Sequence, residues 1–242
     1  MDRSATMTIS AGSIADSTHI EAVADNASIE ESRSIAALVP DEVANQLTHG
    51  IGFLLSLVGA VIITRTSAGT GDTWRIVGCH IYAYSLVSLY LASTLSHSFQ
   101  QPRLRSFFRT LDQVCIFLLM AGGFTPFALA HLRDGAWWMV LAGMWLFALV
   151  GIGVRVYHSQ KTIPTGYFVL LGLIPMVTLG RMVEVSQLSG LMLFLAGAVS
   201  YAIGTVFLFT DDKVRYFHAA WHVCVIWGSI CHFMFLFLYV AH

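Results

Sequence analysis

Residues 216–233 read YFHAAWHVCVIWGSICHF, and apolar residues continue from there to the end of the chain. This stretch is long enough to cross the hydrocarbon of a membrane, which takes about 20 apolar residues in a helix. It nevertheless contains three histidines, His218, His222 and His232. Ionisable groups within a membrane span are costly and usually face a cavity or a functional site. The stretch therefore predicts a spanning helix that contributes polar side chains to a site.

The composition of the whole chain agrees with a membrane protein. Of its 242 residues 56% are hydrophobic and 11% are charged, whereas soluble domains carry about 25% charged residues. The net charge of −1 gives no sign of a nucleic-acid partner. The four cysteines lie in or beside apolar segments without the spacing of a disulfide framework, so they are interpreted as buried thiols.

The remaining apolar segments predict an all-α fold, a bundle of seven transmembrane helices in residues 41–242. Residues 1–40 are polar, acidic and poor in aromatic residues, which predicts a disordered cytoplasmic tail, with one short helix near residues 20–39. The fifth predicted span contains Pro175 and has the weakest pattern. The predicted spans are residues 44–66, 76–97, 111–132, 137–156, 164–181, 188–210 and 217–240.

Basic residues indicate how these spans are oriented, because cytoplasmic loops carry an excess of Lys and Arg. With a cytoplasmic N-terminus, nine basic residues fall inside and four outside, which places the C-terminus outside. The inner set is Arg3, Arg33, Arg103, Arg105, Arg109, Arg155, Lys161, Lys213 and Arg215, and the outer set is Arg65, Arg75, Arg133 and Arg181.

With this orientation, polar residues from four spans gather at the cytoplasmic end of the bundle. Two of them, His218 and His222, are four residues apart, so both rings lie on one helix face. The residues in question are Glu42, Asn45 and His49 at the start of the first span, His97 at the end of the second, Asp112 at the start of the third, and His218 and His222 at the start of the seventh.

Three of these residues are candidate metal ligands. His97, His218 and His222 would give a zinc ion three imidazoles and leave one position open, as in catalytic zinc sites, where bound water becomes acidic. Alternatively, the HxxxH pair is simply two histidines at the interface between membrane and water. Asp112 is a candidate base or water-orienting group, or an interfacial helix cap. Ser93, one turn before His97, is a candidate hydrogen-bond donor to a ligand or substrate carbonyl, or a helix-packing residue.

Four segments of the chain resemble the hemolysin III proteins of the progestin and adipoQ receptor (PAQR) family, which includes the adiponectin receptors. They are EVANQLTHGIG (42–52), STLSHS (93–98), TLDQVCIFLLMAGGFTPFAL (110–129) and HAAWHVCVIWGSICHF (218–233), and the match covers about residues 40–242. The resemblance implies a seven-helix fold with a cytoplasmic N-terminus. It implies a zinc ion held by His97, His218 and His222, with Asp112 close to the water on the metal. It also implies structural or site-lining roles for Glu42, Asn45 and His49.

Three functions are compatible with this sequence. The first is a zinc-dependent hydrolase of lipid amides or esters, since the adiponectin receptors resemble alkaline ceramidases in the layout of their site. The second is a non-enzymatic membrane sensor or regulator in which zinc is structural, with Asp112 as a fourth ligand. The third is a pore, which the scarcity of charged residues in the spans disfavours. All three concern a multi-pass membrane protein with membrane lipids as partners, and the resemblance to hemolysin III proteins implies a bacterial inner membrane.

Overall fold

The computed structural model describes residues 12–157 and 164–242, and the secondary structure of this part of the chain is helical throughout. The chain divides into two units, Met1–Pro40 and Asp41–His242. The described helices are α1 (Gly12–Ala68), α2 (Thr73–Ser98), α3 (Pro102–His131), α4 (Trp138–Tyr157), α5 (Thr165–Leu173), α6 (Leu179–Leu208) and α7 (Phe217–Tyr239), with short 3₁₀ helices η1 (Gly135–Trp137) and η2 (Ile174–Thr178).

The first unit differs in conformation from the tail that its composition predicts. Residues 12–40 are helical and form the first part of α1, whereas the sequence predicts disorder with one short helix near residues 20–39. The segment is rich in alanine and glutamate, which have high helix propensity. The local preference of these residues accounts for the difference.

The second unit is held together by close packing of helices at small residues. A Cβ atom added at Gly78 of α2 would lie 2.7 Å from the Cα atom of Pro126 in α3. A Cβ atom added at Gly122 of α3 would lie 2.5 Å from the Ser85 hydroxyl oxygen of α2. Small residues allow helix backbones in membranes to approach closely, which compensates for the lack of a hydrophobic driving force in lipid.

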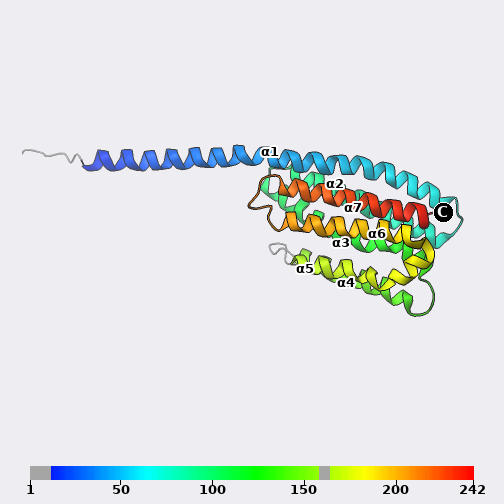
Figure 1. Cartoon of the computed structure of the whole chain (residues 1–242). Coiled ribbons are helices and arrows are strands. Elements are labelled where there is room, and N and C mark those ends of the chain that lie inside the picture. The colour runs from blue at the N-terminus through cyan, green and yellow to red at the C-terminus, as the bar shows by residue number, and fades with distance from the viewer. Residues whose placement is uncertain (1–11, 158–163) are drawn as a thin grey trace, which may run out of the picture. The chain divides into compact units, whose positions relative to one another are not determined.

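Helices α6 and α7 form an antiparallel pair (Figure 1). Near the start of α6, Ser189 accepts a hydrogen bond of 2.9 Å from the hydroxyl of Tyr239, near the end of α7. Further along α6, the Ser200 hydroxyl donates to the carbonyl of Cys224 at 2.8 Å. The first turns of α7 therefore lie beside the last turns of α6.

Six helical runs in the described part of the chain are long and apolar enough to cross a membrane, rather than the seven that the sequence predicts. The fifth and sixth predicted spans fall within one run of 43 residues, Gly166–Leu208. This run is interrupted twice: η2 contains Pro175, and Gln187 inside α6 has φ 57° and ψ −170°. Because of these interruptions, the 43-residue run is not one straight helix.

The polar residues singled out in the sequence lie at one end of the second unit. His97 is in the last turn of α2, and His218 and His222 are in the first turns of α7, as predicted. Asp112 lies further inside its helix than predicted, because α3 begins at Pro102 rather than at residue 111. Proline suits the first turn of a helix, where its missing N–H has no partner to lose.

Candidate metal centre

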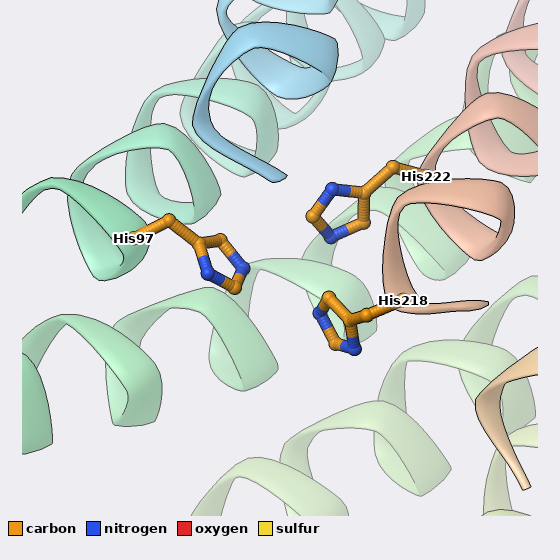
Figure 2. Close-up of side chains that lie close together, drawn as sticks. All are labelled: His97, His218 and His222. Atoms are coloured by element: carbon orange, nitrogen blue, oxygen red, sulfur yellow. The ribbon is translucent and has the colours of Figure 1, made fainter. Parts of the chain in front are cut away.

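Three histidine side chains from α2 and α7 converge in the structure. His97, His218 and His222 each offer one ring nitrogen, and these nitrogens all lie within 4.8 Å of one another. The centroids of the His97 and His222 rings are 5.2 Å apart, and those of His218 and His222 are 4.6 Å apart. Figure 2 shows the three rings directed toward a common point. His218 and His222 lie on one face of α7 because they are four residues apart, and the end of α2 brings His97 next to them.

Each of the three rings is held through its Nδ1 atom by an oxygen of a neighbouring side chain. The Nδ1 atom of His97 lies 2.7 Å from a carboxylate oxygen of Glu42, and that of His218 lies 2.6 Å from a carboxylate oxygen of Asp211. The Nδ1 atom of His222 lies 3.1 Å from the hydroxyl oxygen of Thr48. In metal sites, histidine ligands are commonly oriented in this way by an oxygen on the second ring nitrogen.

These contacts determine which nitrogen of each ring carries the proton. Ionised carboxylates only accept hydrogen bonds, so Nδ1–H donates in His97 and His218. The Thr48 hydroxyl lies 2.9 Å from the carbonyls of Ala44 and Asn45 and donates its one proton there. Its oxygen therefore accepts from Nδ1–H of His222. All three Nε2 atoms are left with a lone pair, which is the form that binds a metal ion.

Glu42 connects three helices at this end of the bundle. Its second carboxylate oxygen forms an ion pair with Arg105 of α3 and lies 3.8 Å from Arg109. Glu42 itself belongs to α1 and His97 to α2. The Glu42 carboxylate therefore lies between the positive charge of the arginines and the His97 ring.

Two of the three oxygen partners were not identified from the sequence. Thr48 adjoins His49 in the quoted motif, but nothing in its spacing indicates that it would face His222. Asp211 lies in the turn before α7, seven residues from His218, and turn geometry of this kind does not follow from a sequence pattern. The only available signal was the position of both residues at the same end of the bundle as the histidines.

Asp112 lies beside the histidines without belonging to the set of three. Its carboxylate interacts with the His97 ring and the Ser93 hydroxyl, but it is not among the donor atoms that lie within 4.8 Å of one another. Ser93, a candidate hydrogen-bond donor to a ligand or substrate or else a helix-packing residue, is buried in the structure, and its hydroxyl faces Asp112. Asp112 therefore lies beside the His97 ring but outside the group of three donor atoms.

Asn45 and His49 line the α1 side of the centre. The His49 ring stacks on His222 with centroids 3.5 Å apart, and it meets the edge of the Tyr90 ring at 5.2 Å. His49 is 3% exposed, and neither of its ring nitrogens has a hydrogen-bond partner within the protein. The same holds for the buried side-chain oxygen of Asn45. His49 therefore packs against His222, and both Asn45 and His49 place polar atoms beside the site.

The contact between Asp211 and His218 leads to a prediction about metal affinity. Replacing Asp211 with alanine removes the acceptor for Nδ1–H of His218, so the ring loses its orientation. Loss of such an outer partner typically lowers metal affinity by about 10- to 100-fold. Competition with a fluorescent zinc chelator measures this affinity. The control is Asp212→Ala, which removes the same charge at the exposed neighbouring residue and is expected to bind zinc like the wild type. Equal affinities of both variants would contradict the role of Asp211.

The fold and this centre define a multi-pass helical membrane protein with a candidate three-histidine metal site at one end. Comparison with known proteins gives the family. The model of the haemolysin-III-related family matches residues 38–233, so the chain belongs to the hemolysin III family, within the PAQR group. Its apolar helices make it an integral membrane protein, and its bacterial relatives indicate the plasma membrane.

Individual relatives cover most of the chain. Hemolysin-3 of Bacillus cereus is 34% identical over 213 residues, which is 87% of this chain and 97% of the relative. A hemolysin-3 homolog of Bacillus subtilis (strain 168) is 32% identical over 203 residues, 83% of this chain and 95% of the relative. The human monocyte to macrophage differentiation factor is 26% identical over 211 residues, 83% of this chain and 84% of that protein.

Proposed function

We propose that the protein binds one zinc ion through His97, His218 and His222 and hydrolyses an amide or ester bond of a membrane lipid. The observation that carries this proposal is the set of three rings whose Nε2 atoms share a common point while their Nδ1 atoms are occupied. Asp112 beside this set supplies the acid–base group that hydrolysis needs.

The donor set fits zinc in a catalytic rather than a structural role. Structural zinc sites are closed by four protein ligands, whereas catalytic sites use three and leave one position open. Among the described residues, the donor atoms that lie together are three imidazoles and no carboxylate. This supports Asp112 as an outer residue and disfavours the alternative in which zinc only stabilises a sensor. When bound, Zn²⁺ supplies a Lewis acid that polarises a carbonyl group and acidifies water.

The roles of the protein residues in such a reaction follow from their contacts. Asp112 accepts the proton of a water molecule whose oxygen adds to the substrate carbonyl carbon. As the carbonyl carbon–nitrogen or carbon–oxygen bond breaks, the same carboxyl group returns the proton to the leaving amine or alcohol. Ser93 holds the Asp112 carboxylate in position, while Glu42, Thr48 and Asp211 fix the rings through Nδ1. The products are a carboxylic acid and an amine or alcohol.

A lipid is the substrate class that suits this location. Apolar side chains cover the outside of the helices, including Leu54, Leu146 and Val206, each more than 60% exposed. The centre lies close to one end of the spans, at the depth where the carbonyl groups of lipids meet the headgroup region. The near-neutral composition offers no surface for nucleic acid.

We further propose seven crossings, with the N-terminus in the cytoplasm. Gln187 divides the 43-residue run into two segments of about 20 residues, which is the length of one crossing each. Arg181 donates to the carbonyl of His131 at 3.5 Å, at the end of α3. The chain then reverses, and α6 runs back along α7 (Figure 1).

Cysteine labelling from the two sides of intact cells tests this topology. A cysteine at Lys213 is expected to react only with a membrane-permeant reagent, and one at Asp134 also with an impermeant one. The native cysteines are first replaced with serine. If the impermeant reagent labels the cysteine at position 213 and not the one at position 134, the proposed orientation is wrong. If it labels both, the two positions lie on the same side, and the number of crossings between them is even rather than odd.

The hydrolase proposal is tested with purified zinc-loaded protein in lipid vesicles. The substrates are an N-acyl sphingoid base and a matched lipid ester, and the readout is released fatty acid. We expect release that stops when a chelator removes zinc and resumes when zinc is restored. Absence of release from both substrates by protein that retains its zinc would favour a regulatory protein with structural zinc.

A further inference from the structure

A second set of polar side chains lies at the end of the bundle opposite the histidines. Asp112 and His131 are both in α3 and are separated by about 28 Å at about 1.5 Å per residue. Near His131 the structure contains two cavities, with volumes of about 610 and 310 Å³. The smaller is lined by Ala130, His131, Arg133, Asp134 and Arg181. This smaller cavity, called the arginine pocket below, has the size of a site for a small polar group.

The arginine pocket contains an unusual concentration of positive charge for its position. The arrangement of Lys and Arg assigns four arginines to the side opposite the histidines, which is the side with fewer basic residues. Two of the four, Arg133 and Arg181, line this one pocket. A third, Arg75, lines the neighbouring cavity and forms a hydrogen bond to the carbonyl of His242. Three of the four arginines on this side therefore line one or other of the two neighbouring cavities.

The two pocket arginines retain donor capacity. In the described part of the chain, the ion pair found for Arg133 is a long one of 3.9 Å to Asp72, an acid that Arg75 shares at the same distance. Arg181 donates from Nε to the His131 carbonyl and from Nη1 to Glu184, at 2.7 Å. These contacts hold the Arg181 guanidinium and leave Nη2 free to donate. In addition, the buried Nε2 atom of His131 has no hydrogen-bond partner within the protein.

The chemistry of the pocket suits a ligand that carries both charges. Guanidinium groups bind phosphate oxygens in a planar, two-pronged geometry. Asp134 on the same pocket supplies a carboxylate for an ammonium group. Trp137 and Trp138 lie three and four residues after Asp134, and the Trp138 ring meets that of Trp74 with centroids 5.9 Å apart. Tryptophan is enriched where a membrane meets water, at the depth of the lipid headgroups.

We propose that the arginine pocket binds the headgroup of a zwitterionic phospholipid from the leaflet opposite the metal centre. Arg133 and Arg181 contact the phosphate, and Asp134 contacts a primary ammonium group, as in a phosphoethanolamine headgroup. This assignment concerns a separate site and does not depend on the proposed hydrolase.

The test uses the purified full-length chain and native mass spectrometry, which counts the lipids that remain bound. Lipids with phosphoethanolamine and phosphoglycerol headgroups are titrated separately, and soluble phosphoethanolamine and inorganic phosphate are added as competitors. We expect one tightly held phosphoethanolamine lipid per chain. Arg133→Gln and Arg181→Gln are expected to weaken its binding by roughly tenfold each, since hydrogen bonds to charged groups contribute about that much. Arg181→Lys keeps the charge but loses the planar geometry, and it is expected to bind weakly too.

Arg65→Gln is the matched control, because it removes the same charge on the same side without lining either cavity. Thermal unfolding and zinc content of each variant show that the fold is retained. Equal binding by the wild type and both glutamine variants would overturn the proposal. Equal affinity for the two headgroups would overturn the role of Asp134. Displacement of the lipid by stoichiometric soluble phosphoethanolamine or phosphate would overturn a lipid as the ligand and identify a small phosphate compound instead.

Discussion

Replacing His97 or His222 with alanine is expected to remove zinc from the protein. Wild-type protein, purified without chelators and analysed by elemental mass spectrometry, should contain about one zinc ion per chain. Each variant loses one of three ligands, so its affinity should fall by more than the ~100-fold that the loss of an outer partner can cost. Because metal binding stabilises only the folded state, the melting temperature of both variants should fall as well.

The control for this experiment is His80→Ala. His80 lies in α2 like His97, but its ring contacts the carbonyl of Ile76 far from the centre. This variant should retain its zinc and its melting temperature. Zinc at the wild-type level in His97→Ala and in His222→Ala would show that the three rings do not hold the metal, and the hydrolase proposal would fail with them.

Replacing Asp112 with asparagine should abolish lipid hydrolysis while leaving the zinc in place. Asparagine has nearly the same shape as aspartate but cannot accept the proton of a water molecule. The loss of a general base typically lowers a rate by about 10²- to 10⁴-fold. Since Asp112 lies outside the set of three donors, zinc content and melting temperature should stay close to those of the wild type. Fatty-acid release and zinc content, measured on the same preparation, separate the two effects.

Asp41→Asn is the matched control for Asp112→Asn. Asp41 lies at the same end of the bundle and pairs with Arg215 at 3.4 Å, so this variant removes an equal charge outside the centre. It should hydrolyse lipid at the wild-type rate. A parallel loss of zinc and activity in Asp112→Asn would instead make Asp112 a metal ligand. That result would support the closed, structural site of a membrane regulator.

The helices were predictable from the sequence because long apolar segments have few alternatives in a membrane. Loops rich in glycine, proline and charge separate most of them, and α7 begins and ends within a residue of its predicted bounds. The run Gly166–Leu208 was harder to divide, because it remains apolar through Pro175 and only a short polar segment, residues 181–187, separates its two apolar parts. The helix of residues 12–40 is longer than the short helix predicted near residues 20–39, because a charged, polar composition indicates solvation and says little about local conformation.

The site was predictable where helix periodicity or a motif carried the information. The spacing of His218 and His222 follows from the helix repeat, and His97 was placed by the end of its span. The hydrogen-bond partners of the three histidine rings could not be predicted in this way. Glu42 was recognised as part of the site but not as the acceptor for His97, and Thr48 and Asp211 were not identified. Such contacts depend on helix rotation and on turn conformation, which a single sequence does not encode in any regular spacing.

The metal centre also has a consequence for biosynthesis. Its donors come from α2 and from the last helix, α7, and their oxygen partners come from α1 and from the turn just before α7. A nascent chain that has not yet inserted α7 contains only one of the three donors. With the proposed coordination, zinc would be acquired only after α7 has been inserted, and its retention would report that α1, α2 and α7 have reached their final places.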